Sequence, residues 1–129
     1  MARPNMQLTG TVLDSPDAQA LAAFYESLLG WSREKDTPKW VKLVPPGGGA
    51  GLSFQSEPAY VRPKWPSSRD RQQMMLHLDI EVADLDAAVE YAVRCGAQVA
   101  EFQPQERVRV MLDPAGHPFC LWVRSTPGP

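Results

Sequence analysis

Residues 77–97, HLDIEVADLDAAVEYAVRCGA, are the stretch of sequence that decides the fold. Their first residues continue an apolar and polar alternation that predicts a half-buried strand over 75–82. Asp84 then stands where a helix N-cap is expected, and Gly96 stands where a helix stops. An apolar stripe at helical spacing lies between them, formed by Leu85, Ala88, Val89, Ala92 and Val93. The stretch therefore predicts a strand followed directly by an amphipathic helix.

A second stretch of the same kind lies nearer the N-terminus. Residues 6–13 read as a strand, Ser15 and Pro16 as the N-cap and first position of a helix, and Gly30 as its end. The apolar face of this helix is formed by Leu21, Phe24, Tyr25, Leu28 and Leu29. Strand and helix thus occur twice in the same order.

Three short β-type runs follow each predicted helix. They are 31–35, 40–44 and 51–56 after the first helix, and 98–102, 107–112 and 118–124 after the second. A constant shift of 67 residues places Asp17 on Asp84, Val41 on Val108 and Gly49 on Gly116.

We therefore predict one α+β domain over residues 1–129, made of two βαβββ modules. The modules cover about 6–56 and 74–124, and a connecting loop covers 57–73. Tyr60 and Trp65 in this loop favour an ordered segment at the edge of a cleft over a plain surface linker.

Composition excludes several classes of protein. The 129 residues carry a formal net charge of −2 with scattered Lys and Arg, which speaks against a nucleic-acid partner. No apolar run is long enough to span a membrane, and the N-terminus lacks the apolar region of a signal peptide. Cys95 and Cys120 have no metal-binding or redox spacing, so we expect a reduced, cytoplasmic protein.

Three motifs resemble the vicinal oxygen chelate superfamily, which includes glyoxalase I, bleomycin-resistance proteins and extradiol dioxygenases. They are AFYESLLGW at 23–31, the stretch 77–97, and LDPAGHPFCLWV at 112–123. The combination is most similar to the small glyoxalase-like domain branch. The resemblance implies paired βαβββ modules whose sheets curl around a concave cup, and a homodimer.

The resemblance also implies where a metal would be held, by one side chain from the first and last strands of each module. His77 and Cys120 match two of these positions, and their repeat mates are Gly10 and Ser53, with Gln55 as a substitute for Ser53. Gly10 cannot ligate, and no carboxylate stands at a matched position. We therefore predict no metal, with His77, Gln55 and Cys120 as weak candidates.

His77 without a metal has two interpretations. It is either a histidine satisfied by backbone or water, or a general base or ligand partner oriented by Asp79 on the same strand face. Cys120 reads as an inert thiol rather than a nucleophile. His117 follows a DPAG turn, so we expect it to stabilise that turn.

Strand alternation sorts the remaining side chains. It predicts that Val41, Leu43, Val108 and Val110 face the helices. The side chains predicted to face the cup are Trp40, Lys42, Gln55, Arg107, Arg109, Met111 and Trp122. These residues either meet solvent or a partner subunit, or they form a pocket for a flat, partly anionic molecule.

Three functions follow from this sequence. The first is metal-free binding of a small organic molecule, through Trp40, Gln55, Trp65, His77, Asp79, Arg109, Cys120 and Trp122. The second is a metal-dependent lyase, isomerase or dioxygenase of the glyoxalase type, with His77 as the catalytic candidate. The third is a structural or interaction module.

Overall fold

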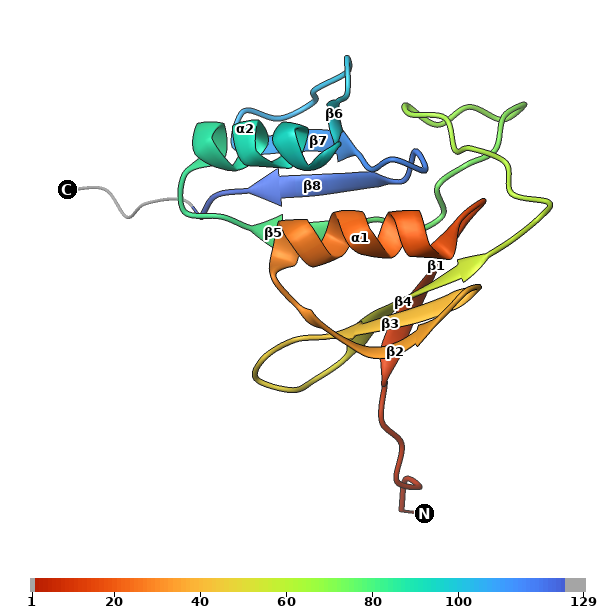
Figure 1. Ribbon diagram of the computed structural model, residues 1–129. Coiled ribbons are helices and arrows are strands. Elements are labelled where there is room, and N and C mark those ends of the chain that lie inside the picture. The colour runs from red at the N-terminus through yellow and green to blue at the C-terminus, as the bar shows by residue number, and fades with distance from the viewer. Residues whose placement is uncertain (1, 125–129) are drawn as a thin grey trace. The chain divides into compact units, whose positions relative to one another are not determined.

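The computed structural model describes residues 2–124 and contains two βαβββ modules (Figure 1). The chain divides into two compact units after Tyr60, and each unit holds one module. Module 1 comprises β1 (Gly10–Ser15), α1 (Ala18–Leu29), β2 (Ser32–Thr37), β3 (Trp40–Val44) and β4 (Gly51–Ser56). Module 2 comprises β5 (Leu78–Glu81), α2 (Leu85–Cys95), β6 (Gln98–Val99), β7 (Val108–Leu112) and β8 (Pro118–Trp122).

Each module forms its own four-stranded mixed sheet. The strand order is β1-β4-β3-β2 in module 1 and β5-β8-β7-β6 in module 2. In both sheets the first strand pairs in parallel with the last, and the other neighbours are antiparallel. The predicted α+β class and the two-module organisation are confirmed.

Helix α1 begins two residues later than the sequence predicts. Its N-cap is Asp17, whose carboxylate accepts hydrogen bonds from the backbone N–H groups of Gln19 (3.0 Å) and Ala20 (3.3 Å). Ser15 ends strand β1 instead, and its hydroxyl accepts from the backbone N–H of Asp17. The helix ends as predicted at Gly30, which has the left-handed conformation (φ 70°).

The core of module 1 lies between α1 and one face of its sheet. Leu21 and Tyr25 of α1 and Phe54 of β4 are almost fully buried, and the rings of Tyr25 and Phe54 stack with centroids 5.5 Å apart. Val41 and Leu43 are fully buried on the same sheet face, as alternation predicts. The opposite face of β3 and β4 is therefore left to polar and aromatic side chains.

Module 2 repeats this arrangement, but its helix α2 buries fewer residues against the sheet than α1 does. Asp84 and Gly96 cap α2 as predicted, and Phe119 and Leu121 of β8 are buried beneath the helix. Of the predicted apolar stripe, Ala92 is fully buried. Val93 is 46% exposed, so its predicted place in the core is wrong.

The constant shift of 67 fails at one strand. It correctly places Ser53 of β4 on Cys120 of β8. However, Ser53 pairs with Lys42 of β3, whereas Cys120 pairs with Val110 of β7. The shift in residue number that relates β3 to β7 is therefore 110 − 42 = 68, one more than the shift that relates β4 to β8. The cause is the turn between β7 and β8, which is one residue shorter than the turn between β3 and β4.

This change of register reverses the predicted faces of β7. Directly paired residues share a face of the sheet, and Arg109 pairs with the buried Leu121. Val110 pairs with Cys120, on the other face. The prediction that Arg109 lines the same face as Cys120 is therefore wrong. Val108 and Val110 were predicted to face the helix but lie on the face of Cys120 and Trp122. Met111 was predicted to line the cup but lies on the face of Phe119.

The turn between β7 and β8 is organised around a buried carboxylate. Asp113 is 1% exposed and accepts from the backbone N–H groups of Ala115 (2.9 Å) and His117 (3.0 Å). The His117 ring nitrogen Nδ1 lies 2.8 Å from Asp113 Oδ2. These contacts agree with the turn-stabilising role expected for His117.

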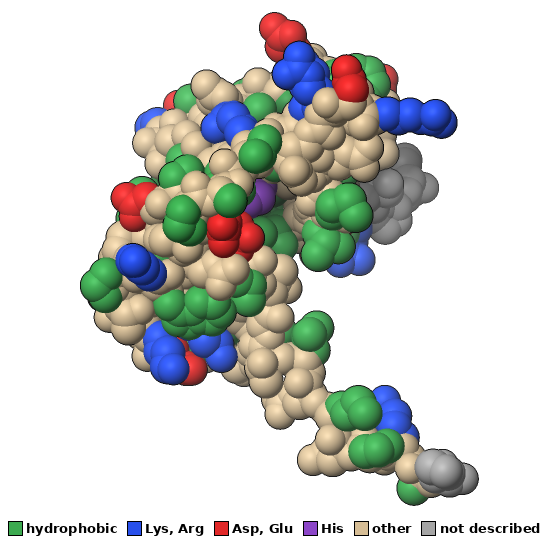
Figure 2. Space-filling model, turned by 90° about the vertical axis from the view of Figure 1, so that its right-hand side faces the viewer, with side chains coloured by type: hydrophobic (Ala, Val, Ile, Leu, Met, Phe, Trp, Pro, Cys, Tyr) green, Lys and Arg blue, Asp and Glu red, His purple; other side chains and the backbone are tan. Residues whose placement is uncertain are grey.

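Charged side chains of both signs occur on the surface. On the face drawn in Figure 2, Lys and Arg side chains alternate with Asp and Glu and form no continuous basic patch. Among residues 2–124, neither helix has the length and apolar character needed to cross a bilayer.

Candidate functional site

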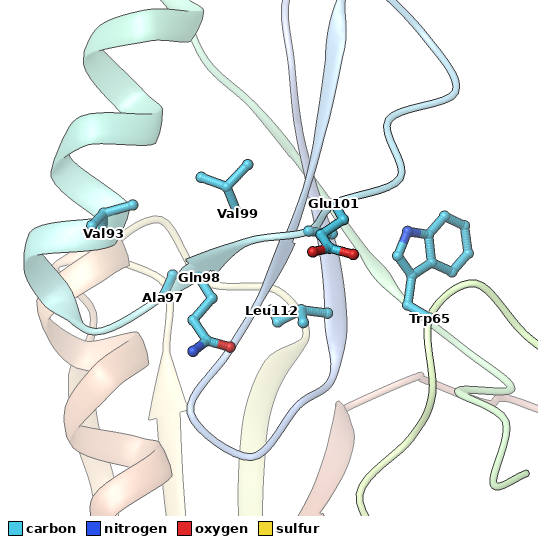
Figure 3. Close-up of a pocket in the computed structure, with 8 residues that line it drawn as sticks. Trp65, Val93, Ala97, Gln98, Val99, Glu101 and Leu112 are labelled. Carbon is cyan, nitrogen blue, oxygen red and sulfur yellow. The ribbon is translucent and has the colours of Figure 1, made fainter.

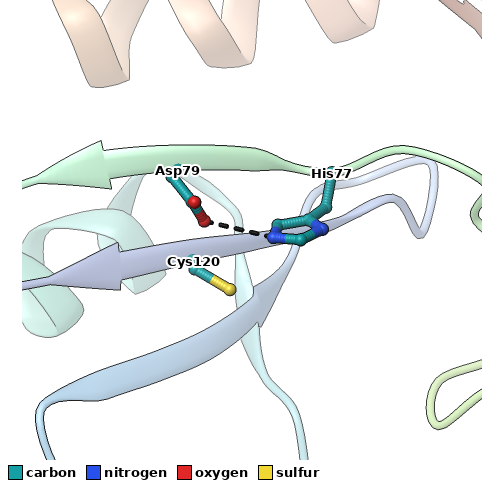
Figure 4. A group of neighbouring side chains, drawn as sticks. All are labelled: His77, Asp79 and Cys120. Atoms are coloured by element: carbon teal, nitrogen blue, oxygen red, sulfur yellow. Dashed lines mark ion pairs between the residues drawn. The ribbon is translucent and has the colours of Figure 1, made fainter.

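Three polar side chains meet on the face of the module 2 sheet opposite to Phe119 and Leu121. Asp79 of β5 pairs directly with Cys120 of β8, and His77 precedes β5 by one residue. His77 Nε2 lies 3.2 Å from Asp79 Oδ1 (Figure 4). The potential ligand atoms of all three lie within 4.8 Å of one another. The structure thus brings together three of the predicted site residues.

The protonation of Cys120 follows from its surroundings. Burial raises the pKa of the thiol, and the negative charge of Asp79 and a hydrogen bond to its carboxylate raise that pKa further. A thiol with a raised pKa keeps its proton near neutral pH and is a weak nucleophile. The geometry therefore favours Cys120 as a neutral group on this face.

The chemistry of these three side chains bears on whether the cluster could hold a metal ion. Imidazole, thiolate and carboxylate are all zinc ligands, and Asp79 supplies a carboxylate that the matched positions alone do not contain. Zinc would have to displace the thiol proton that burial and Asp79 stabilise. The repeat mates Gly10 and Ser53 add no imidazole or carboxylate, so the four matched positions do not supply the ligand set that the resemblance implies for a metal-dependent glyoxalase.

Trp122 extends the same face along β8. Its ring lies beneath the guanidinium of Arg124, with 5.7 Å from Cζ to the ring centroid. Glu81 holds that guanidinium through contacts of 2.7 and 3.0 Å. The pKa of Glu81 is lowered, first by the hydrogen bond from Arg124. Arg124 and Trp122 thus form a cation–π contact on this face of the sheet.

Module 1 carries a pocket on the face of its sheet that α1 leaves open. The pocket has a volume of about 410 Å³ and includes Trp40, Lys42, Gly10 and Ser53. Gly10 contributes no side chain, so the floor of the pocket is backbone there. Its other lining residues are Thr9, Val12, Glu34 and Lys35. The two positions that match metal ligands in the resemblance therefore line a hollow.

Charges around this pocket are only partly neutralised. Lys42 Nζ lies 3.6 Å from a carboxylate oxygen of Glu34. Lys35 has no ion pair with any residue in 2–124, although it lines the same pocket. Gln55 lies on the same sheet face, paired with Trp40, and its amide donates to Asp14 Oδ1 at 2.7 Å.

Two predicted site residues lie away from the polar cluster of module 2, Arg109 on β7 and Trp65 in the connecting loop. The Arg109 guanidinium donates to the backbone carbonyls of Glu106 (2.9 Å) and Val108 (3.0 Å), which gives it a structural role. Trp65 packs against Phe102 with ring centroids 6.1 Å apart and lines a different pocket beside β6.

Sequence reasoning missed two partners of the site. Asp14 holds Gln55, and Glu81 holds the Arg124 guanidinium above Trp122. Both follow an i, i+2 alternation along a first strand, since Asp14 shares the face of Val12 and Glu81 shares the face of Asp79. That alternation was a usable signal for both residues.

Comparison with known proteins agrees with this architecture. The family model described as glyoxalase-like domain matches residues 10–122, and the chain belongs to this family. No curated protein matches the sequence.

Solved structures of several bacterial proteins share the fold. A glyoxalase/bleomycin resistance protein/dioxygenase family enzyme from Burkholderia phytofirmans PsJN is 18% identical, with a TM-score of 0.68 over 92% of this chain and 98% of that one. A glyoxalase-related enzyme from Fulvimarina pelagi is 19% identical, with a TM-score of 0.66 over 93% and 89%. A glyoxalase/dioxygenase from Nostoc punctiforme is 20% identical, with a TM-score of 0.65 over 93% and 92%. The shared property is the fold.

Proposed function

We propose that this protein binds a small organic molecule and holds no tightly bound metal. The observation that carries the proposal is the 410 Å³ pocket of module 1, which includes Gly10 and Ser53. A volume of this size suits a small organic ligand. Gly10 and Ser53 stand at positions where a metal-dependent relative would need ligands, and in this protein they line the pocket.

The lining of the pocket suggests the chemistry of the ligand. Trp40 offers a flat apolar surface, and stacking on such a ring adds about 0.5–1.5 kcal/mol beyond the area buried. Lys42 and Lys35 supply two cations against the single carboxylate of Glu34. A planar aromatic molecule with a carboxylate or another anionic group matches this combination.

We also propose the polar face of module 2, taken by itself, as a surface that orients a small organic molecule. The paired His77 and Asp79 offer a hydrogen-bond donor and acceptor, and Trp122 offers a second aromatic surface. Trp122→Ala should weaken binding at this module 2 surface more than it lowers the free energy of unfolding, because the ring lies on the face not covered by α2.

A thermal-shift screen of aromatic carboxylates, with and without divalent metals, tests the proposal. We expect a carboxylate to stabilise the protein without metal, and its Kd to rise in Trp40→Ala and Lys35→Gln. Lys39→Gln is the matched control, since Lys39 is exposed and does not line the pocket. Equal weakening by Lys39→Gln, or stabilisation only with added metal, would contradict the proposal.

A metal-assisted enzyme is the second candidate function. The cluster of His77, Asp79 and Cys120 favours it, because three possible ligand atoms lie within 4.8 Å of one another. A bound divalent ion would supply Lewis-acid chemistry there. Catalysis that depends on His77 and on added metal would promote this candidate over the first.

The protein is proposed to act as a cytoplasmic homodimer, and the third candidate function makes dimerisation its main role. Sedimentation at tens of micromolar protein detects ordinary dimer affinities. A monomer at that concentration would contradict the dimer. A dimer that no small molecule stabilises would favour the interaction module.

A further inference from the structure

A second pocket lies beside β6, at the opposite edge of the module 2 sheet from β5 (Figure 3). Its volume is about 580 Å³, larger than the module 1 pocket. The residues that shape its chemistry are Trp65, Glu101, Gln98, Val93, Val99 and Leu112. Asp79 lies on the other edge strand, β5, and His77 directly precedes that strand, so this pocket is separate from the polar cluster.

Trp65 reaches this pocket from the connecting loop and is held in place. Its indole Nε1–H donates to the backbone carbonyl of Phe102 at 3.2 Å. Its ring packs on the Phe102 ring with centroids 6.1 Å apart and a tilt of 43°. The indole is therefore positioned before any ligand arrives, which lowers the entropy cost of binding against it.

Glu101 supplies a negative charge to the same pocket. Its carboxylate has no hydrogen bond or ion pair with any of residues 2–124. In Figure 3 its side chain lies on the Trp65 side of the pocket. The pocket thus combines an aromatic ring with an uncompensated carboxylate.

Apart from Gln98, the side chains of the remaining wall are apolar. Val93 of α2 and Val99 of β6 are each 46% exposed, although both are large hydrophobic residues. Exposed apolar side chains that cluster around a hollow favour a ligand with apolar groups of its own. A small inorganic ion would leave this wall in water.

We propose that this pocket binds a small organic cation, of the class of alkylated ammonium compounds. Methyl groups on the cation would contact the indole of Trp65 and the two valines, and the positive charge would face Glu101. Among the aromatic side chains, tryptophan attracts a cation above its ring face most strongly. Anions are disfavoured because Glu101 repels them.

Choline and its neutral carbon analogue, 3,3-dimethylbutan-1-ol, test the proposal by two-dimensional NMR. We expect choline to shift the Trp65 indole N–H resonance and the backbone amides of residues 98–101. Glu101→Gln should weaken choline binding by about fivefold and leave the weak binding of the neutral analogue unchanged. Trp65→Leu should also weaken choline binding, because leucine keeps apolar volume but removes the ring.

Glu90→Gln is the matched control, since Glu90 is an exposed carboxylate on α2 that does not line the pocket. We expect it to bind choline as the unaltered protein does. Equal affinity for choline and the neutral analogue would overturn the proposal, as would unchanged binding in Glu101→Gln. Choline shifts confined to the Trp40 indole would overturn it too.

Discussion

The carboxylate of Asp113 organises the last hairpin of module 2 from an almost fully buried position. It accepts from two backbone N–H groups and contacts the His117 ring at 2.8 Å. Without this carboxylate the backbone N–H groups of the turn would lose their acceptor, and a buried N–H group without an acceptor lowers the free energy of unfolding. The DPAG sequence thus positions β8, which carries Cys120 and Trp122.

Asp113→Ala should lower the free energy of unfolding by about 2–3 kcal/mol, because buried donors lose their acceptor. Urea unfolding measures this change. The control is Asp70→Ala, where an exposed carboxylate accepts a hydrogen bond from the Ser68 hydroxyl, at a cost within about 0.5 kcal/mol. Similar losses in the two variants would show that burial of Asp113 is not the cause.

Cys120 should react slowly with iodoacetamide near neutral pH, since burial and then Asp79 raise its pKa. Asp79→Asn removes the neighbouring negative charge, which lowers the thiol pKa toward its burial-determined value. The alkylation rate at neutral pH should rise by about threefold. Peptide-resolved mass spectrometry separates Cys120 from Cys95. Asp70→Asn should leave the rate unchanged, and a slower reaction in Asp79→Asn would refute the electrostatic argument.

At the scale of elements, Gly51 allows strand β4 to approach strand β3 closely. Gly51 pairs with Gly10 of β1, and a Cβ on Gly51 would collide with the backbone carbonyl of Leu43 on β3. Backbone cannot yield as a flexible side chain does. The close approach of β3 and β4 therefore depends on Gly51, and the pocket face with Ser53 and Trp40 depends on that approach.

Gly51→Ala should lower the free energy of unfolding by about 2 kcal/mol or more, because β3 and β4 must separate. Gly47→Ala is a matched control in the turn between these strands, where a Cβ meets nothing within 4 Å. That variant should be neutral or more stable by up to about 1 kcal/mol. Thermal unfolding compares the two, and a tolerated Gly51→Ala would refute the packing argument.

Elements were predictable from sequence where the signal was local. Caps and periodicity located both helices, with the start of α1 misplaced because Ser15 and Asp17 are both good capping residues. The faces of β7 were not predictable from a constant repeat shift. One residue fewer in the turn after β7 reverses every side chain on that strand, which moved Arg109 off the predicted site.

At the scale of the whole molecule, the two modules share a fold but differ in the chemistry of their open faces. Module 1 presents a pocket with Trp40 and lysines, and module 2 presents the cluster of His77, Asp79 and Cys120. The family could be predicted from the sequence motifs because these motifs encode turns, helix caps and core packing, which are properties of the fold. The pockets were harder to foresee, because they depend on which side chains are missing or displaced.

Protein purified without chelator should carry no stoichiometric zinc, nickel or iron. The cluster of His77, Asp79 and Cys120 offers three donors, but metal binding must first remove a proton from a thiol whose pKa is raised. Titration with Co²⁺ reports directly on this step, because a cobalt–thiolate bond gives a near-ultraviolet charge-transfer band that Cys120→Ser would abolish. We expect no such band near neutral pH, and its first appearance as the pH is raised through the thiol pKa. A band at neutral pH, or metal in the purified protein that His77→Ala removes, would replace the metal-free proposal with the metal-assisted enzyme.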